Sequence, residues 1–363
     1  EWQIAADAAG DIIMLWESTS TPSGWTCLSC VESDPFYGVF PRASSSYGNA
    51  SSGGPETVGH IFTVSDITTS SAITSESNAG TKTGWSAALE TDKHQSSSTN
   101  NIIGTESILP PFANIRLISA NTTTLPNGAI GIFAVSETSS LPANWTYYSR
   151  LNGNYLRAHE NSTSTGGSAQ HAHTINASTS NANIFATGAT NGGANTLTSN
   201  THKHGFSGDS SNASNTPPYV NVVFAQLTAT TTLGGNTDRL IAMFDNTSLP
   251  TNWVATSSAG TIFSGNLLKG KNSFGAAEFA TSTIHTHATT TITTGQTATT
   301  LVMKGSNNTR YASETHTHTV TIQNNNASNS MPIYRDVILR QFIAPPPTVS
   351  NAILNNGVAI TLT

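Results

Sequence analysis

Short hydrophobic runs alternate with long stretches of Gly, Ser, Thr and Asn along the 363 residues of this chain. The runs are rich in β-branched and aromatic side chains and show no helical period. This pattern predicts an all-β fold with long loops. The clearest predicted strands lie at residues 12–16, 129–135 and 240–244.

These strands belong to a pattern that occurs three times, which favours a tandem repeat. In each copy an apolar run is followed by Pro-x-x-Trp, then by a Gly-led run that ends in Arg or Lys, and finally by an aromatic strand after a proline. Three such β repeats can pack around a pseudo-threefold axis. We place the repeats at 11–121, 122–233 and 234–344, with an N-terminal strand at 1–10 and, at 345–363, a Pro-rich hinge with a β-hairpin or donor strand.

The chain carries very little charge. Only 9% of its residues are Asp, Glu, Lys or Arg, and the net charge is −6, whereas soluble domains average about 25% charged residues. A partner role with nucleic acid or an anionic membrane surface is therefore excluded. No apolar run is long enough to predict a membrane span.

Hydroxyl and amide side chains must form most of the surface, as in secreted proteins that carry glycans. The sequence begins at Glu1 and not at Met, so we expect that a secretory signal was removed and that the protein is extracellular. Asn-x-Ser/Thr sites for glycosylation occur at Asn49, Asn121, Asn144, Asn161, Asn176, Asn212, Asn246, Asn307 and Asn326.

The two cysteines, Cys27 and Cys30, are separated by two residues. A redox motif of this spacing needs a strand-to-helix context, and a zinc site needs a second pair of ligands; neither is evident around them. A local disulfide is the favoured interpretation, with a small effect on stability because its loop is short.

Histidines carry the most specific pattern. Of the eleven, all but His159, which we interpret as a surface residue, follow the repeat. Repeats two and three each hold two His-x-His pairs 31 residues apart, and repeat one holds single histidines at the matching places. The candidate metal ligands are His60, His94, His171, His173, His202, His204, His285, His287, His316 and His318.

On a strand, both rings of a His-x-His pair lie on one face, with Cα atoms about 7 Å apart, so they can converge on one ion. Imidazole suits several transition metals, of which we favour iron or zinc and keep nickel and copper open. The alternatives are loop histidines in a polar segment and buried histidines that form hydrogen bonds in a core.

Two geometries are open for a metal site. Around a pseudo-threefold axis the histidines would form two levels, each with five nitrogens and a water in an octahedral set. In the competing geometry, the two His-x-His pairs of one repeat join, which leaves repeat one without a site. The first level would hold His60, His171, His173, His285 and His287, and the second His94, His202, His204, His316 and His318.

The ordered motifs resemble the tail-collar and tail-fibre repeats of bacteriophages over residues 11–344. The resemblance implies that His-x-His pairs coordinate iron, although Phe62 and Ser96 stand where repeat one would have its second histidines. The tandem fusion departs from these fibres, in which a trimer needs one repeat per chain, whereas three repeats in one chain could form the trimer-like unit internally. The motifs are the pairs Pro22 and Trp25, Pro142 and Trp145, and Pro250 and Trp253, the run from Gly153 to Arg157, the His-x-His pairs, and the Pro217-Pro218-Tyr219 strand start.

The hairpin at 345–363 resembles the first strands of a bacterial immunoglobulin-like module, and the strand at 1–10 also lacks a partner. Two strands of this kind suggest head-to-tail strand complementation between copies, which gives filaments.

We find no motif of a hydrolase, metalloprotease or nucleotide-binding enzyme, so we expect a protein that is not an enzyme. The sequence predicts a secreted structural subunit that polymerises into a metal-stabilised extracellular filament, with itself as partner. The alternative is a trimeric tail-fibre protein or adhesin that recognises cell-surface glycans. Trp25, Trp145 and Trp253 would then stack on sugars, although a repeated Trp more often fills a core.

Overall fold

The computed structural model confirms the all-β prediction. Among the described residues the helical elements are three short 3-10 turns, η1 (Thr138–Ser140), η2 (Ser149–Leu151) and η3 (Gly235–Thr237). No helix in this part of the chain is long and apolar enough to cross a membrane. The structure describes residues 12–45, 56–69, 87–89, 102–160, 162, 164–179, 186–188, 196–198, 204–244, 250–259, 261–274, 284–288, 290–294, 297–305, 308–316, 318–324 and 328–345.

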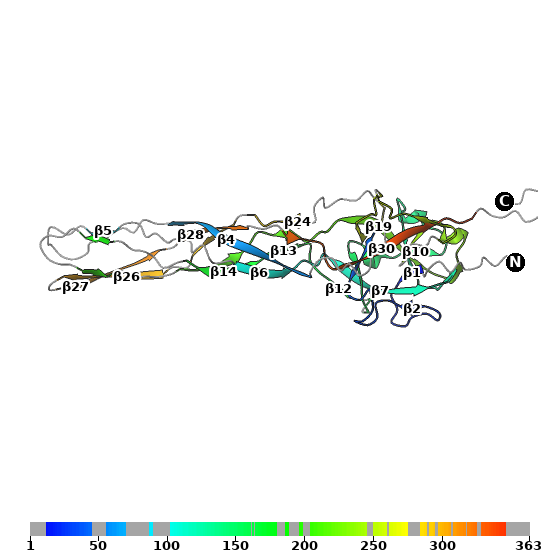
Figure 1. Cartoon of the computed structure of the whole chain (residues 1–363), viewed down its shortest axis with the longest axis horizontal. Coiled ribbons are helices and arrows are strands. Elements are labelled where there is room, and N and C mark those ends of the chain that lie inside the picture. Colours follow the sequence, from blue (N-terminus) through cyan, green and yellow to red (C-terminus); the bar gives the residue numbers. More distant parts are fainter. Residues whose placement is uncertain are drawn as a thin grey trace, which may run out of the picture.

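The molecule has a wide head and a long, narrow shaft (Figure 1). The head contains a 13-stranded sheet, and the apolar runs of the sequence form its central strands. Its strands are β1 (Ile12–Trp16), β2 (Thr26–Cys27), β3 (Phe40–Ala43), β7 (Phe112–Ala120), β9 (Ile130–Phe133), β10 (Trp145–Tyr147), β11 (Tyr155–Ala158), β12 (Thr165–Gly166), β19 (Tyr219–Leu227), β21 (Leu240–Phe244), β22 (Trp253–Ala255), β23 (Leu267–Gly270) and β30 (Tyr334–Phe342).

Strand pairing in the head follows a cyclic order. Within each third of the chain, an opening strand pairs antiparallel with a closing strand: β1 with β7, β9 with β19, and β21 with β30. Each closing strand also pairs parallel with a short strand of the next third: β7 with β11, β19 with β23, and β30 with β3. The last pairing returns to the start of the chain, so the three thirds close into a ring. The division into tandem collar-like repeats stays a prediction, and this pairing is the arrangement that a pseudo-threefold axis would give.

The short strands β3, β11 and β23 each follow a glycine turn. Gly38, Gly153 and Gly265 have φ angles of 74°, 78° and 78°, a left-handed conformation that only glycine adopts at little cost. The glycine that recurs in the sequence pattern therefore directs each short strand toward the closing strand of the preceding third.

A basic side chain lies at each parallel seam, but its partners differ. At the seam that closes the ring, Arg42 forms a two-point ion pair with Asp336, at 2.7 and 2.9 Å, and lies 3.8 Å from the Tyr334 ring centre. At the other two seams the cations pack against aromatic rings, Arg157 on Phe112 and Lys269 on Tyr219, and Arg157 also forms a one-point ion pair with the exposed Glu56 at 2.8 Å. The seam between β3 and β30 joins strands that are far apart in the sequence, and it is the one of these three seams that carries a bidentate ion pair.

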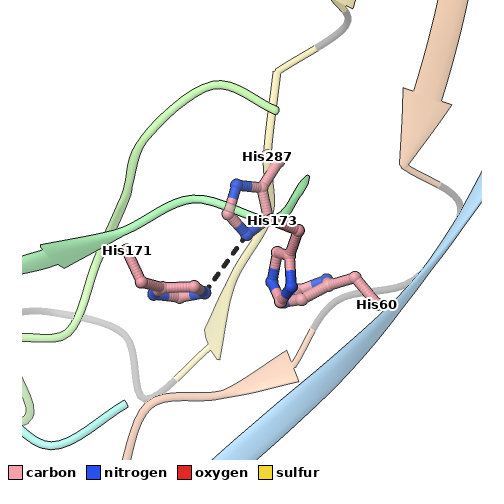
Figure 2. A group of neighbouring side chains, drawn as sticks. All are labelled: His60, His171, His173 and His287. Atoms are coloured by element: carbon pink, nitrogen blue, oxygen red, sulfur yellow. Dashed lines mark hydrogen bonds between the residues drawn. The ribbon is translucent and has the colours of Figure 1, made fainter. Parts of the chain in front are cut away.

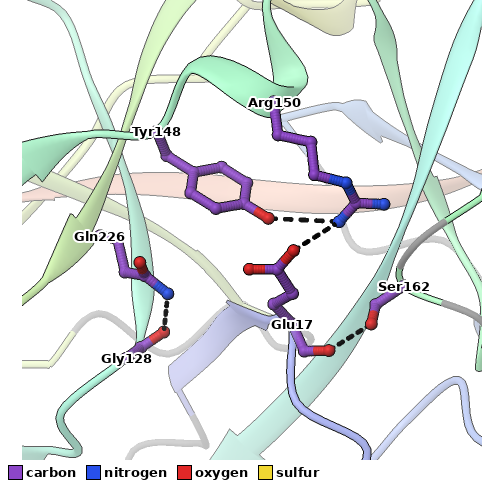
Figure 3. A network of polar contacts seen from close by, with 6 residues as sticks. All are labelled: Glu17, Gly128, Tyr148, Arg150, Ser162 and Gln226. Atoms are coloured by element: carbon purple, nitrogen blue, oxygen red, sulfur yellow. Dashed lines mark hydrogen bonds and ion pairs between the residues drawn. The ribbon is translucent and has the colours of Figure 1, made fainter.

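A polar network also joins the first two thirds of the head (Figure 3). Arg150 donates to a Glu17 carboxylate oxygen at 3.0 Å and to the Tyr148 hydroxyl at 3.2 Å. Burial raises the pKa of Tyr148 to about 12, so the phenol stays protonated at neutral pH. The Ser162 hydroxyl donates to the backbone carbonyl of Glu17. These contacts fix the end of β1 against the second third of the chain.

The recurring tryptophans belong to the head core. Trp145 and Trp253 are buried against Phe133 and Phe244 respectively, and Trp25 packs partly buried on the same cluster. This placement favours the core interpretation over sugar stacking. Two short strands, β8 (Thr124–Leu125) and β20 (Thr231–Thr232), pair with each other in a separate sheet.

The shaft is built from small sheets that extend away from the head (Figure 1). An apolar cluster fills its head-proximal part: Phe62, Ile175, Phe206, Ile292, Val320 and Ile322. Apart from β8 and β20, the strands outside the head sheet are β4 (Thr57–Thr69), β5 (Ala87–Leu89), β6 (Ile102–Ser107), β13 (Gln170–His171), β14 (Thr174–Ser178), β15 (Ala186–Gly188), β16 (Thr196–Thr198), β17 (Gly205–Asp209), β18 (Ala213–Ser214), β24 (Ile284–His285), β25 (Thr290–Thr293), β26 (Thr297–Gly305), β27 (Asn308–His316), β28 (His318–Asn324) and β29 (Ser328–Asn329).

Cys27 and Cys30 form the local disulfide. The predicted N-terminal strand at 1–10 and residues 346–363 of the predicted hinge and hairpin lie outside the described residues. Strand complementation between copies therefore stays a prediction.

Candidate metal centre

The histidines of the first predicted level converge where the shaft begins. His60 lies on β4, His171 ends β13 and His285 ends β24. His173 follows His171 by two residues, and His287 follows His285 by two. Each His-x-His pair therefore spans the end of a strand. Figure 2 shows four of these rings, from three separate segments, pointing toward one another. The ring of the fifth, His285, lies 4.9 Å from that of His60, centre to centre.

The spacing of the ring nitrogens suits a shared ion. The potential ligand atoms of His60, His171, His173 and His287 all lie within 4.8 Å of one another. Nε2 of His60 is 3.0 Å from Nε2 of His285, and Nε2 of His171 is 3.2 Å from Nε2 of His287. Two ligands at right angles, each about 2.1 Å from a metal, are separated by about 3.0 Å. The observed separations are thus those of neighbouring ligands around one metal.

Hydrogen bonds hold two of these rings with a nitrogen lone pair facing the centre. The Asn215 amide nitrogen donates to the carbonyls of Ser168 and Ser107, so its oxygen must accept from Nδ1 of His171, at 2.5 Å. Nδ1 of His287 lies 2.5 Å from the Ser211 carbonyl, which can only accept. Both rings therefore carry their proton on Nδ1, and their Nε2 lone pairs face each other.

Two facing lone pairs repel unless a cation lies between them, so this arrangement favours a bound ion. His173 points to the same conclusion. It is fully buried, and neither of its ring nitrogens has a hydrogen-bond partner among the described residues. A buried imidazole without partners is costly, and coordination of a metal would satisfy it.

Burial keeps these imidazoles neutral, the form that binds metals. Burial and the neighbouring histidines lower the pKa of His173 to about 3 and that of His285 to about 4. Burial also lowers the pKa of His171 and of His287. At neutral pH no proton competes with a metal for these nitrogens.

At the second predicted level, the structure brings two histidines together. His204 and His318 are buried, with ring centres 4.6 Å apart. His316 ends β27, whereas His94 and His202 lie outside the described residues. Five imidazoles are thus placed at the first level and two at the second.

His173 and His204, one histidine from each His-x-His pair of the second repeat, do not meet. His173 and His204 flank opposite ends of the β14–β17 ladder, which pairs Thr174 with Asp209 and Ser178 with Gly205. His204 lies opposite Thr179, which is six residues from His173, a span of about 20 Å along a strand. The competing geometry, in which both pairs of one repeat share an ion, is wrong for this segment.

Buried hydroxyl groups that sequence reasoning missed clamp the histidine backbones. The His173 amide donates to the Ser210 hydroxyl at 2.9 Å, and the Ser210 amide donates back to the His173 carbonyl. Thr179 clamps His204 and Thr294 clamps His318 in the same way. In the second repeat, Thr179 follows His173 by six residues and Ser210 follows His204 by six. This spacing is the sequence signal by which the clamps could have been found.

The remaining predicted sites have varied placements. His159 lies outside the cluster, with its ring centre 4.6 Å from that of Tyr37. Asn121, Asn144 and Asn212 are exposed, as glycosylation requires, and Asn176 lies on β14. Outside the described residues lie Asn49, Asn161, Asn246, Asn307 and Asn326.

No protein-family profile, curated protein or solved structure is significantly similar to this chain. The resemblance to tail-collar and tail-fibre repeats therefore stays a prediction. The geometry of the histidines has to carry the functional argument by itself.

Proposed function

We propose that the protein is a structural fibre subunit whose shaft is fastened to its head by a histidine-bound transition metal. The observation that carries this proposal is the buried convergence of imidazoles from segments more than a hundred residues apart, with lone pairs facing one another. An ion held there would join all three thirds of the chain. Since each ligand belongs to the folded state, bound metal would stabilise the fold.

Metal content and thermal unfolding test this role. The full chain, purified without chelator, should contain at least one ion, and removal of the metal should lower its unfolding temperature. At a free metal concentration about a thousand times Kd, binding contributes about 4 kcal/mol. His171→Ala should weaken binding at this centre, whereas His159→Ala, outside the cluster, is the matched control. A chain without metal, or one equally stable with and without it, would refute the role.

The elongated shape supports a place in an extracellular fibre (Figure 1). We propose that copies polymerise head to tail into a secreted filament, as the unpartnered terminal strands of the sequence suggest. Sparse charge fits close contact between β-rich subunits, because few charges need to be desolvated. A structural role is also favoured over catalysis, because the imidazoles are buried.

The alternative is a tail-fibre or adhesin protein that presents the shaft to a cell-surface glycan. The narrow shaft favours it, but trimerisation is not required, because one chain supplies all three thirds of the ring. Electron micrographs separate the two: regular filaments that disappear on truncation after Ala344 support polymerisation, and discrete single particles support the alternative.

A further inference from the structure

The first histidine level has six inward positions, and one of them is not a histidine. Strand alternation places Phe62 on the same face of β4 as His60, two residues away. The same spacing relates His171 to His173 and His285 to His287. The six positions therefore hold five imidazoles and one phenyl ring.

These six rings form two stacked triads. One consists of His60, His171 and His285, with ring centres separated by 6.2, 4.9 and 4.7 Å. The other consists of Phe62, His173 and His287, with separations of 5.5, 5.9 and 4.8 Å. Two such triads correspond to the six corners of an octahedron, with the phenyl ring at the corner of the missing imidazole. His285 lies outside the group of four imidazoles whose ligand atoms are all within 4.8 Å of one another, and it reaches the centre beside His60, at 3.0 Å between the Nε2 atoms.

Phe62 leaves no suitable place for a water as sixth ligand. It is 2% exposed and packs with Ile175, Phe206 and Ile292 in the apolar cluster of the shaft. A bound water needs polar partners in addition to the metal, and the side chains that pack with Phe62 in this cluster are all apolar. The water expected from the sequence would lie where the phenyl ring lies.

We propose that Phe62 closes the sixth ligand position, so that the ion is five-coordinate and the centre selects ions that accept five nitrogens. This inference rests on the proposed metal centre. Zn²⁺ has no geometric preference from its d electrons, and Cu²⁺ favours tetragonal surroundings with one weak or absent ligand. Ni²⁺ prefers six ligands with imidazole and water, so this five-ligand centre should bind it less well than Zn²⁺ or Cu²⁺. Phe62 is thus a specificity-determining residue of the centre.

Co²⁺ is the probe that reports coordination number. Five-coordinate Co²⁺ absorbs visible light more strongly than octahedral Co²⁺, because it lacks a centre of symmetry. The wild-type chain and Phe62→Leu, the matched apolar control, should show the strong spectrum. Phe62→His, which supplies the sixth imidazole, should weaken the absorption by about threefold or more and raise affinity for Ni²⁺ relative to Zn²⁺ by about tenfold.

X-ray absorption of the Zn²⁺-loaded wild-type chain gives a test that needs no variant. Five nitrogen neighbours support the inference, and six ligands overturn it. A weak Co²⁺ spectrum in wild type that Phe62→His leaves unchanged would also overturn it, while the metal centre itself would stand. If neither Co²⁺ nor Zn²⁺ binds the wild-type chain in equilibrium dialysis, the proposed metal centre fails and this inference fails with it.

Discussion

The substitution His173→Leu should reduce the acid sensitivity of the metal-free protein. His173 is fully buried, and its pKa in the fold is about 3, below the ordinary value of 6.5. In the unfolded chain this imidazole takes up a proton as the pH falls below 6.5, whereas in the fold it stays neutral. Its contribution to stability is thus fully present above that pH and is lost progressively as the pH falls toward 3.

The size of the effect follows from the two pKa values. A pH of about 4.5 lies about 2 pH units below the ordinary pKa of the imidazole in the unfolded chain, so protonation there favours the unfolded state by about 3 kcal/mol. The wild-type protein should therefore lose about 3 kcal/mol more than His173→Leu between about pH 7 and about pH 4.5. The neighbouring His285, with a pKa of about 4, adds to the acid sensitivity of both proteins.

Guanidinium unfolding followed by far-UV circular dichroism, with chelator present and at several pH values, measures this difference. Phe62→Leu is the matched control, because it changes packing in the same layer and removes no titratable group. Its pH dependence should match that of the wild type. If His173→Leu loses stability with acid as steeply as the wild type, burial does not hold His173 neutral. The claim that burial keeps these imidazoles in the form that binds metals is then wrong.

Two further predictions concern the head. Arg42→Ala should destabilise the fold by about 3 kcal/mol, because it leaves the nearly buried Asp336 carboxylate without its ion pair. The control Arg239→Ala removes an exposed ion pair with Asp238, at 3.9 Å, and should lower stability by less than about 1 kcal/mol in the same thermal unfolding assay. If the two substitutions lower stability equally, the ring-closing seam is not important for the fold. Replacing both Cys27 and Cys30 by Ser should cost at most about 2 kcal/mol, since the disulfide closes a very short loop. A larger loss of calorimetric stability would show that the disulfide organises more of the head than its own turn.

The sequence alone determined the local structure of the head. Hydrophobic runs predicted β1 and β21 at their observed bounds, and the Pro217-Pro218-Tyr219 motif predicted the start of β19. These elements are predictable because side-chain alternation, β-branching and turn residues act over a few neighbouring positions.

The spacing of the histidines also identified the candidate ligands. Only the tertiary structure decided which of them meet. The cyclic pairing of closing strands with β3, β11 and β23 brings His60 beside His285, although 225 residues separate them. The spacing from His60 marks Phe62 as the substitute for a second histidine, and the packing of the strands brings its ring against those of His173 and His287. Sequence periodicity sets which way a side chain points, but the partners it meets depend on long-range strand pairing, which local propensity does not encode.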